Sequence, residues 1–172
     1  MFANWLVRAA IRFQVRKAYA DGFDLNGWRT FMKSLGMFAR IPKGITVEPV
    51  DFGRIRAMHF YPIDPLQNCA AVYFHGGLYV GGRPHDYREM VARLSVACNC
   101  PIYAVDYRLA PENPFPAAVE DARAAFTHIN SIYDRTSVIG DSAGAGLAMA
   151  VMRADSEYAQ PVAGVLLSPM VD

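Results

Sequence analysis

The sequence predicts an α/β fold in which a mostly parallel sheet is covered by helices on both faces. Four short, continuous apolar runs support this, at residues 70–74, 102–105, 138–139 and 162–167. Runs that are apolar at every position are typical of strands buried on both faces. Helix-prone segments separate these runs, and the alternation of strand and helix favours a doubly wound sheet. The chain has 172 residues and no internal repeat or linker, which fits one such domain.

The N-terminal segment is predicted to be helical. Arg8, Arg12 and Arg16 recur at helical spacing. The opposite face of the same helix is apolar: Phe2, Trp5, Leu6, Ala9 and Phe13. Such a helix either packs on the domain, the interpretation we favour, or lies on a membrane surface. Its apolar stretch is too short and too charged to cross a membrane, and it lacks a signal-cleavage site. We therefore expect no stable membrane insertion.

Turn and strand patterns follow this helix. The pairs Asp21-Gly22 and Asn26-Gly27 are turn signals. From Ile45 the apolar pattern changes to alternation, which predicts one or two antiparallel strands ending at Pro62. His59 falls within this alternation and is interpreted as a strand residue without a chemical role.

Two helices are predicted between the apolar runs. The first begins near Asp86, which together with Glu89 matches a capping box. Its apolar residues repeat at helical spacing: Tyr87, Met90, Val91 and Leu94. The second begins near Pro116, a residue that suits a first helical turn. Its apolar face is formed by Val119, Ala122, Phe126 and Ile129.

Composition excludes several classes of function. A net charge of +1 gives no basic surplus for binding phosphates, so we expect no nucleic-acid partner. Three cysteines (Cys69, Cys98 and Cys100) have neither a disulfide-framework spacing nor a second pair of metal ligands. They are interpreted as reduced thiols of a cytoplasmic protein, with no metal site and no cofactor.

Residues 140–144 read Gly-Asp-Ser-Ala-Gly, which matches the Gly-x-Ser-x-Gly nucleophile elbow of serine hydrolases. A β-prone stretch precedes the motif, at residues 136–139, and a helix-prone stretch follows it, at residues 145–153. The sharp turn strains the serine backbone and crowds its neighbours, which explains the glycines. The pattern predicts that Ser142 is a nucleophile on a strand-to-helix turn.

Two further segments bear on the same chemistry. His75-Gly76-Gly77-Leu78 directly follows the run at 70–74, so its backbone N–H groups could stabilise the oxyanion of acyl transfer. A plain glycine turn would account for the same residues. Residues 106–121 contain three closely spaced prolines, which on physical grounds alone predict only a stiff, structured loop.

Taken in order, residues 75–77, 107–121 and 140–144 closely resemble the bacterial hormone-sensitive-lipase-like family. Its members are carboxylesterases with the α/β-hydrolase fold. The three motifs span most of residues 70–144, and their combination is highly specific. Residues 167–172 also resemble the end of the strand that follows the nucleophile helix in that family.

The resemblance implies a division of the chain and a set of roles. Residues 1–40 would be a helical cap segment, and residues 41–172 part of an α/β-hydrolase core. Ser142 would be the nucleophile, with His75 and Gly76 supporting the loop. The oxyanion hole would be formed by the N–H groups of Gly77, Leu78 and Ala143. The substrates would be small carboxylic esters with short to medium acyl chains.

The sequence departs from the family pattern in two ways. The loop usually reads His-Gly-Gly-Gly, and a positive φ at Leu78, which replaces the last glycine, would cost about 1 kcal/mol or more. The family's acid and histidine lie on later loops, whereas Asp172 comes too early to be that acid. All histidines precede Ser142: His59, His75, His85 and His128. We therefore expect the N-terminal portion of such a hydrolase, truncated after the strand that follows the nucleophile helix and inactive alone.

Two alternatives stay open. The same triad hydrolyses amides, so an amidase or formamidase of this fold is a second interpretation. A non-catalytic α/β domain that binds a ligand or a partner is a third. In the family's topology a further strand flanks the run at 162–167, and this chain lacks it. We therefore expect this run to form an open sheet edge, with self-association or a complementing C-terminal chain.

Overall fold

A computed structural model describes residues 22–153 and 159–170, and within them a six-stranded sheet has the order β1-β2-β4-β3-β5-β6. Strands β1 and β2 form an antiparallel hairpin, β2 is antiparallel to β4, and β4, β3, β5 and β6 are parallel. The strands are β1 Ile45–Phe52, β2 Ile55–Pro62, β3 Cys69–Phe74, β4 Ile102–Asp106, β5 Arg135–Asp141 and β6 Gly164–Leu167. The mostly parallel sheet and the hairpin ending at Pro62 are confirmed.

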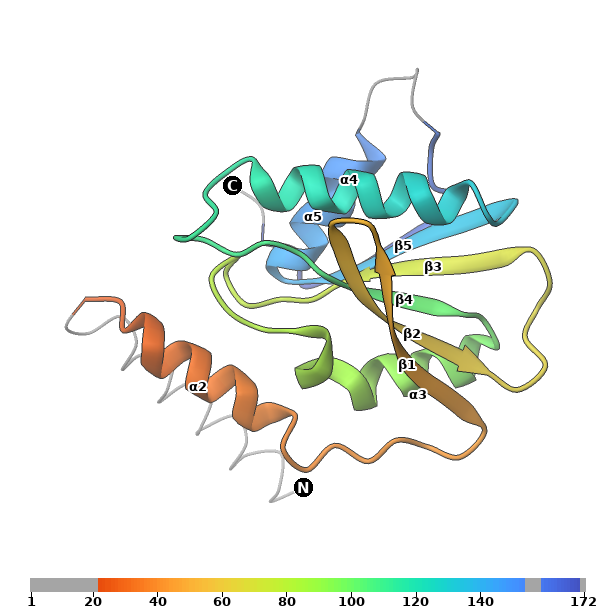
Figure 1. Ribbon diagram of the computed structural model, residues 1–172, viewed down its shortest axis with the longest axis horizontal. Coiled ribbons are helices and arrows are strands. Elements are labelled where there is room, and N and C mark those ends of the chain that lie inside the picture. Colours follow the sequence, from red (N-terminus) through yellow and green to blue (C-terminus); the bar gives the residue numbers. More distant parts are fainter. Residues whose placement is uncertain (1–21, 154–158, 171–172) are drawn as a thin grey trace.

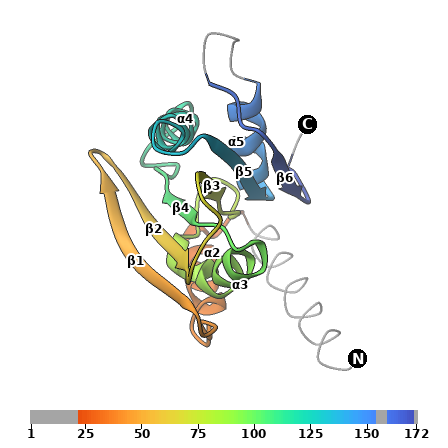
Figure 2. The same cartoon turned by 90° about the vertical axis from the view of Figure 1, so that its right-hand side faces the viewer.

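Helices cover both faces of the sheet (Figure 1). The helices of the described residues are α2 Leu25–Leu35, the 3₁₀ helix η1 Pro84–Tyr87, α3 Arg88–Cys98, α4 Ala117–Asn130 and α5 Ala143–Met152, of which α3, α4 and α5 lie on the faces of the sheet. Figure 2 shows α4 and α5 on one side of the strands and α3 on the other. The doubly wound arrangement is therefore confirmed for these residues.

Strand β3 shows why the apolar runs are continuous. Val72 and Phe74 pack into a core cluster with residues of α4 and α5, whereas Ala71 and Tyr73 pack into a second cluster with residues of α3. Successive side chains of a strand point to opposite faces, and here both faces are buried. Every position of the strand must therefore be apolar or have a satisfied polar end.

Helix starts differ from two sequence predictions. Asn26-Gly27 is not a turn but lies in the first turn of α2, because Asp24 caps this helix by accepting a hydrogen bond from the Gly27 N–H (2.9 Å). The predicted capping box of Asp86 and Glu89 is also wrong. Helix α3 begins only after η1, without a side-chain cap, and Glu89 instead accepts a hydrogen bond from the Arg40 N–H (2.8 Å). The helix predicted around Arg8 lies outside the described residues.

Strand β6 lies at an edge of the described sheet and pairs there with β5. Its assigned bounds are shorter than the run at 162–167, although the Val162 N–H donates to the Thr136 carbonyl (2.9 Å) and the Val138 N–H to the Ala163 carbonyl (3.0 Å). The strand is not covered on both faces, because Val165 is 47% exposed and Leu167 is also exposed. This strand nevertheless contacts the functional site, as described below.

Candidate active site

Ser142 lies on the predicted strand-to-helix turn, between the end of β5 and the start of α5. Its backbone adopts φ 51° and ψ −117°, a conformation that is strained for a residue with a side chain. Gly144 allows the close approach that the turn needs, because a Cβ there would lie 2.0 Å from the Phe74 carbonyl oxygen. Strand β6 and the residues after it hold the turn, since the Ser142 N–H donates to the Leu167 carbonyl (2.9 Å) and the Met170 N–H to the Ser142 carbonyl (3.0 Å).

The glycine-rich loop follows β3 at the same end of the sheet. Gly77 has φ 128°, and Leu78 and Tyr79 each have φ 61°. The Gly77 carbonyl accepts hydrogen bonds from the N–H groups of Val80 (3.1 Å) and Gly81 (3.0 Å), which closes the loop into a tight turn. The positive φ at Leu78 therefore occurs, with the strain that an L-residue incurs there.

Asp141 joins this loop to the serine turn. Its Oδ1 accepts hydrogen bonds from the Gly76 N–H (2.9 Å) and from the Tyr73 hydroxyl. Burial raises the pKa of the Asp141 carboxyl, and these two hydrogen bonds oppose the rise. The residue before Ser142 thus holds the first glycine of the loop next to the serine turn. Sequence reasoning missed this role, because the elbow motif allows any residue at the position of Asp141, and the type found there does not indicate a contact.

His75 is buried beneath the loop. Its ring stacks on Tyr107 (centroids 4.3 Å apart) and on Tyr87 (5.7 Å), and its Nδ1 hydrogen-bonds the Gly76 carbonyl (2.7 Å). Desolvation lowers the pKa of His75 to about 4, against a smaller opposite effect of the Gly76 carbonyl. His75 is therefore neutral near pH 7 and donates from Nδ1 to that carbonyl, a geometry that suits loop support.

The segment between β4 and α4 is tied to the same loop. The Ala110 N–H donates to the Tyr79 carbonyl (2.9 Å). Further along, the buried carboxylate of Asp121 accepts hydrogen bonds from the Arg108 backbone N–H (2.9 Å) and from Nη2 of the Arg108 guanidinium (2.8 Å). These hydrogen bonds hold the proline-rich segment in place beside the glycine-rich loop.

Helix α2 holds the outer side of the loop, a contact that the sequence did not reveal. The Trp28 indole N–H donates to the Gly77 carbonyl (3.3 Å), and Arg29 Nε donates to the Val80 carbonyl (2.7 Å). Arg29 also forms a two-pronged ion pair with Glu112 (2.7 and 2.6 Å), which raises the pKa of the arginine and lowers that of Glu112 to about 2. Helix α2 thus contacts both the glycine loop and the proline-rich segment through side-chain hydrogen bonds.

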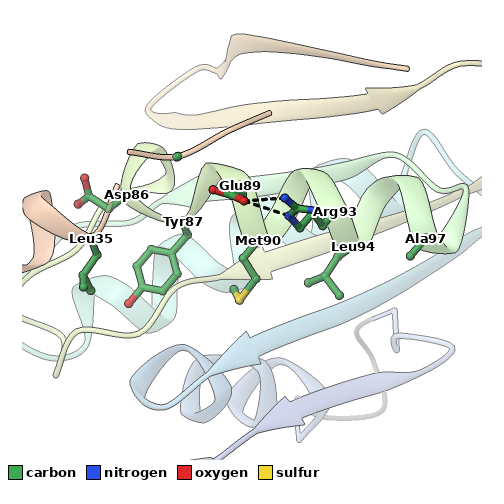
Figure 3. Close-up of a pocket in the computed structure, with 9 residues that line it drawn as sticks. Leu35, Asp86, Tyr87, Glu89, Met90, Arg93, Leu94 and Ala97 are labelled. Atoms are coloured by element: carbon green, nitrogen blue, oxygen red, sulfur yellow. Dashed lines mark hydrogen bonds and ion pairs between the residues drawn. The ribbon is translucent and has the colours of Figure 1, made fainter. Parts of the chain in front are cut away.

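Two of the hollows near these elements differ in their relation to Ser142. One, of about 330 Å³, is lined mainly by apolar residues of the loop, the proline-rich segment and α5: Tyr79, Ala110, Asn113, Phe115, Pro116, Ala118, Val119, Gly146 and Leu147. The other, of about 590 Å³, runs along α3 and includes Tyr87, Met90 and the ion pair of Arg93 with Glu89 (Figure 3). Only the first hollow is lined by the helix that Ser142 begins.

The four histidines have partners away from Ser142. His59 stacks on Tyr103 and His128 on Phe52, with ring centroids 4.3 and 4.6 Å apart. His85 contacts Arg88 (3.0 Å). Across residues 22–153 and 159–170, no side chain hydrogen-bonds the Ser142 hydroxyl. In the same residues, no group of three His, Cys, Asp or Glu side chains could hold a metal ion. No helix among them is long and apolar enough to cross a membrane.

Comparison with known proteins gives relatives of one kind. A family model for the alpha/beta hydrolase fold matches residues 71–172. The acetyl-hydrolase of Streptomyces hygroscopicus is 42% identical over 106 residues, which cover 59% of this chain and 36% of the relative. The carboxylic ester hydrolase LipN of Mycobacterium tuberculosis is 34% identical over 139 residues, which cover 72% of this chain and 37% of LipN.

Solved structures agree with these relatives. A hormone-sensitive lipase from a metagenome library has a TM-score of 0.80 at 31% identity, over 96% of this chain and 58% of that one. An esterase from the bacterial hormone-sensitive lipase family has a TM-score of 0.81 at 32% identity, over 91% of this chain and 55% of that one. The chain thus spans between about a third and three-fifths of the length of these relatives. It resembles solved members of the bacterial hormone-sensitive lipase family, and it belongs to the α/β-hydrolase family.

Proposed function

We propose that this chain supplies the nucleophile and the oxyanion hole of a serine esterase that acts on small carboxylic esters with short to medium acyl chains. The observation that carries the proposal is the strained turn at Ser142, joined through Asp141 to a glycine loop with positive φ angles. Names of relatives such as acetyl-hydrolase and carboxylic ester hydrolase support the ester class. Residues 1–40 are proposed to cap the site, and the hydrogen bond from Arg29 to the Val80 carbonyl in the loop supports this assignment.

The proposed reaction follows from this geometry. The Ser142 Oγ attacks the carbonyl carbon of the ester and gives its proton to a general base. The resulting oxyanion is stabilised by the backbone N–H groups of Gly77, Leu78 and Ala143, and the alcohol then departs with a proton. Water hydrolyses the acyl-serine by the same steps, which releases the carboxylic acid and restores Ser142. The base and its acid partner are proposed to lie outside these 172 residues, because each histidine here has another partner.

The test uses p-nitrophenyl acetate and a fluorophosphonate label. For the chain alone, we expect turnover far below that of a complete enzyme, because loss of a triad histidine costs roughly a million-fold. Together with the sequence that follows residue 172 in its gene, the chain should hydrolyse the ester and take the label at Ser142. Ser142→Ala should abolish both, whereas the matched change Ser137→Ala on β5 should preserve them.

Other outcomes separate the alternatives. Faster hydrolysis of an anilide than of the ester would assign the site to amides, and absence of both reactions in the complete protein would assign it to a non-catalytic domain. Robust hydrolysis by the chain alone, lost in Ser142→Ala, would mean that a base lies within it.

A cytoplasmic location is also proposed, because the thiols of Cys69, Cys98 and Cys100 are free.

A further inference from the structure

Two of the three cysteines lie side by side at the end of the sheet opposite Ser142. The Sγ atoms of Cys69 and Cys100 are 3.8 Å apart, and both side chains are partly buried. Cys69 begins β3, and Cys100 stands two residues before Ile102, which pairs in β4 with Ala71. Cys69 at the start of β3 therefore lies beside Cys100, in the connection that leads into the neighbouring parallel strand β4. Such strands lie about 4.8 Å apart, a Cα separation that a disulfide spans.

Hydrogen bonds on both sides hold the two segments together. The Leu66 N–H donates to the Asn99 carbonyl (2.9 Å), and the Ala71 N–H donates to the Pro101 carbonyl (2.9 Å). The Ser95 hydroxyl fixes the backbone of Cys100 by donating to its carbonyl (2.7 Å). The separation of the thiols is therefore set by paired backbone and not by mobile loops.

We propose that Cys69 and Cys100 form a reversible disulfide when the protein meets a small disulfide oxidant such as oxidised glutathione. One protein thiolate attacks a sulfur of the oxidant, which forms a mixed disulfide and releases one molecule of reduced glutathione. The other cysteine loses its proton to solvent and displaces the second glutathione. The two protein thiols together lose two hydrogens and two electrons, and the oxidant gains them as two molecules of reduced glutathione.

Burial, and to a smaller extent the neighbouring Cys69, raises the pKa of the Cys100 thiol. Either thiol of the pair can attack the oxidant first, and the other then closes the disulfide. Cys98, at the end of α3, is exposed and hydrogen-bonds neither of them.

The pair is separate from the proposed chemistry. Cys69 and Cys100 lie where β3 and β4 begin, whereas the glycine loop and Ser142 follow the ends of β3 and β5 (Figure 1). A bond here would close residues 69–100 into a loop that contains the glycine turn and α3. The glycine loop would thus lie within a covalently closed segment, whereas Ser142 lies outside it.

The test counts thiols by mass spectrometry. The purified chain is incubated with millimolar oxidised glutathione, unfolded, alkylated with iodoacetamide and weighed. We expect the number of alkyl groups to fall from three to one, with a mass loss of two hydrogens and no glutathione adduct. Digestion with trypsin should link the peptides 57–88 and 94–108, and dithiothreitol should restore three alkyl groups.

Matched variants identify the bond. Cys98→Ser should leave no alkylated cysteine after oxidation, whereas Cys100→Ser should give no internal disulfide. Three alkyl groups after oxidation, a stable glutathione adduct on Cys69 or Cys100 of the unaltered chain, or a bond within peptide 94–108 that joins Cys98 to Cys100 would each overturn the proposal.

Discussion

The substitution Gly144→Ala tests the close packing of the serine turn against β3. A Cβ on Gly144 would lie 2.0 Å from the Phe74 carbonyl oxygen and 2.6 Å from that of His75, well inside the 3.4 Å at which ordinary contact begins. Both oxygens belong to the backbone and cannot rotate away, so α5 must move from the strand. Overpacking of this kind costs about 3 kcal/mol, and alanine returns up to about 1 kcal/mol through its helix propensity.

We therefore expect Gly144→Ala to lower the free energy of unfolding by about 2–3 kcal/mol, or the melting temperature by roughly 5–10 °C, in urea and thermal denaturation followed by circular dichroism. Gly146→Ala is the matched control on the same helix. Its Cβ would meet the Tyr79 hydroxyl at 2.3 Å, the end of a side chain that can rotate, and the nearest backbone atom at 3.3 Å. This variant should stay within about 1 kcal/mol of the wild type. A Gly144→Ala protein as stable as Gly146→Ala would refute the packing argument.

Three further predictions concern the loop and the edge strand. Because burial depresses the pKa of His75 to about 4, its stabilising contribution is complete above the ordinary value of 6.5 and is lost as the pH falls towards 4. Between about pH 7.5 and pH 5 the wild type should lose about 2 kcal/mol more unfolding free energy than His75→Gln, and equal losses would contradict this. Leu78→Gly should raise the unfolding free energy in urea by up to about 1 kcal/mol, because it removes the cost of φ 61°; a decrease would show that packing of the leucine matters more. Val165→Lys should reduce self-association in size-exclusion chromatography, since Val165 is exposed on an edge strand, and a monomeric wild type at high concentration would rule out that interface.

The strands could be predicted because burial on both faces leaves a direct trace in the sequence. Val72 and Tyr73 are adjacent in β3 yet enter different cores, so the strand is apolar throughout. The run at 162–167 also pairs with β5 over its whole length, because hydrogen bonds of Val162 and Ala163 with β5 extend the pairing beyond the assigned start of β6 at Gly164. The turn signal Asn26-Gly27 failed because Asp24, two residues earlier, caps a helix there.

The site was predictable only where its chemistry imposes a backbone motif. Gly144 and Ser142 are recognisable because a sharp turn tolerates few other residues. Asp141 and Arg29 were not, because their partners lie 65 and 51 residues away along the chain. Contacts of that range depend on the fold as a whole and leave no spacing pattern in the sequence.

The attachment of the serine turn to β6 has a consequence for local opening. The Ser142 amide hydrogen is held by the Leu167 carbonyl, on the outermost strand of the described sheet, and not by the central strands. Edge strands fray at a lower free energy than the core, so this amide should exchange with solvent deuterium sooner than that of Val72, in the central strand β3. Ser142, the proposed nucleophile, is thus held by the edge of the sheet, whereas the glycine loop follows a central strand.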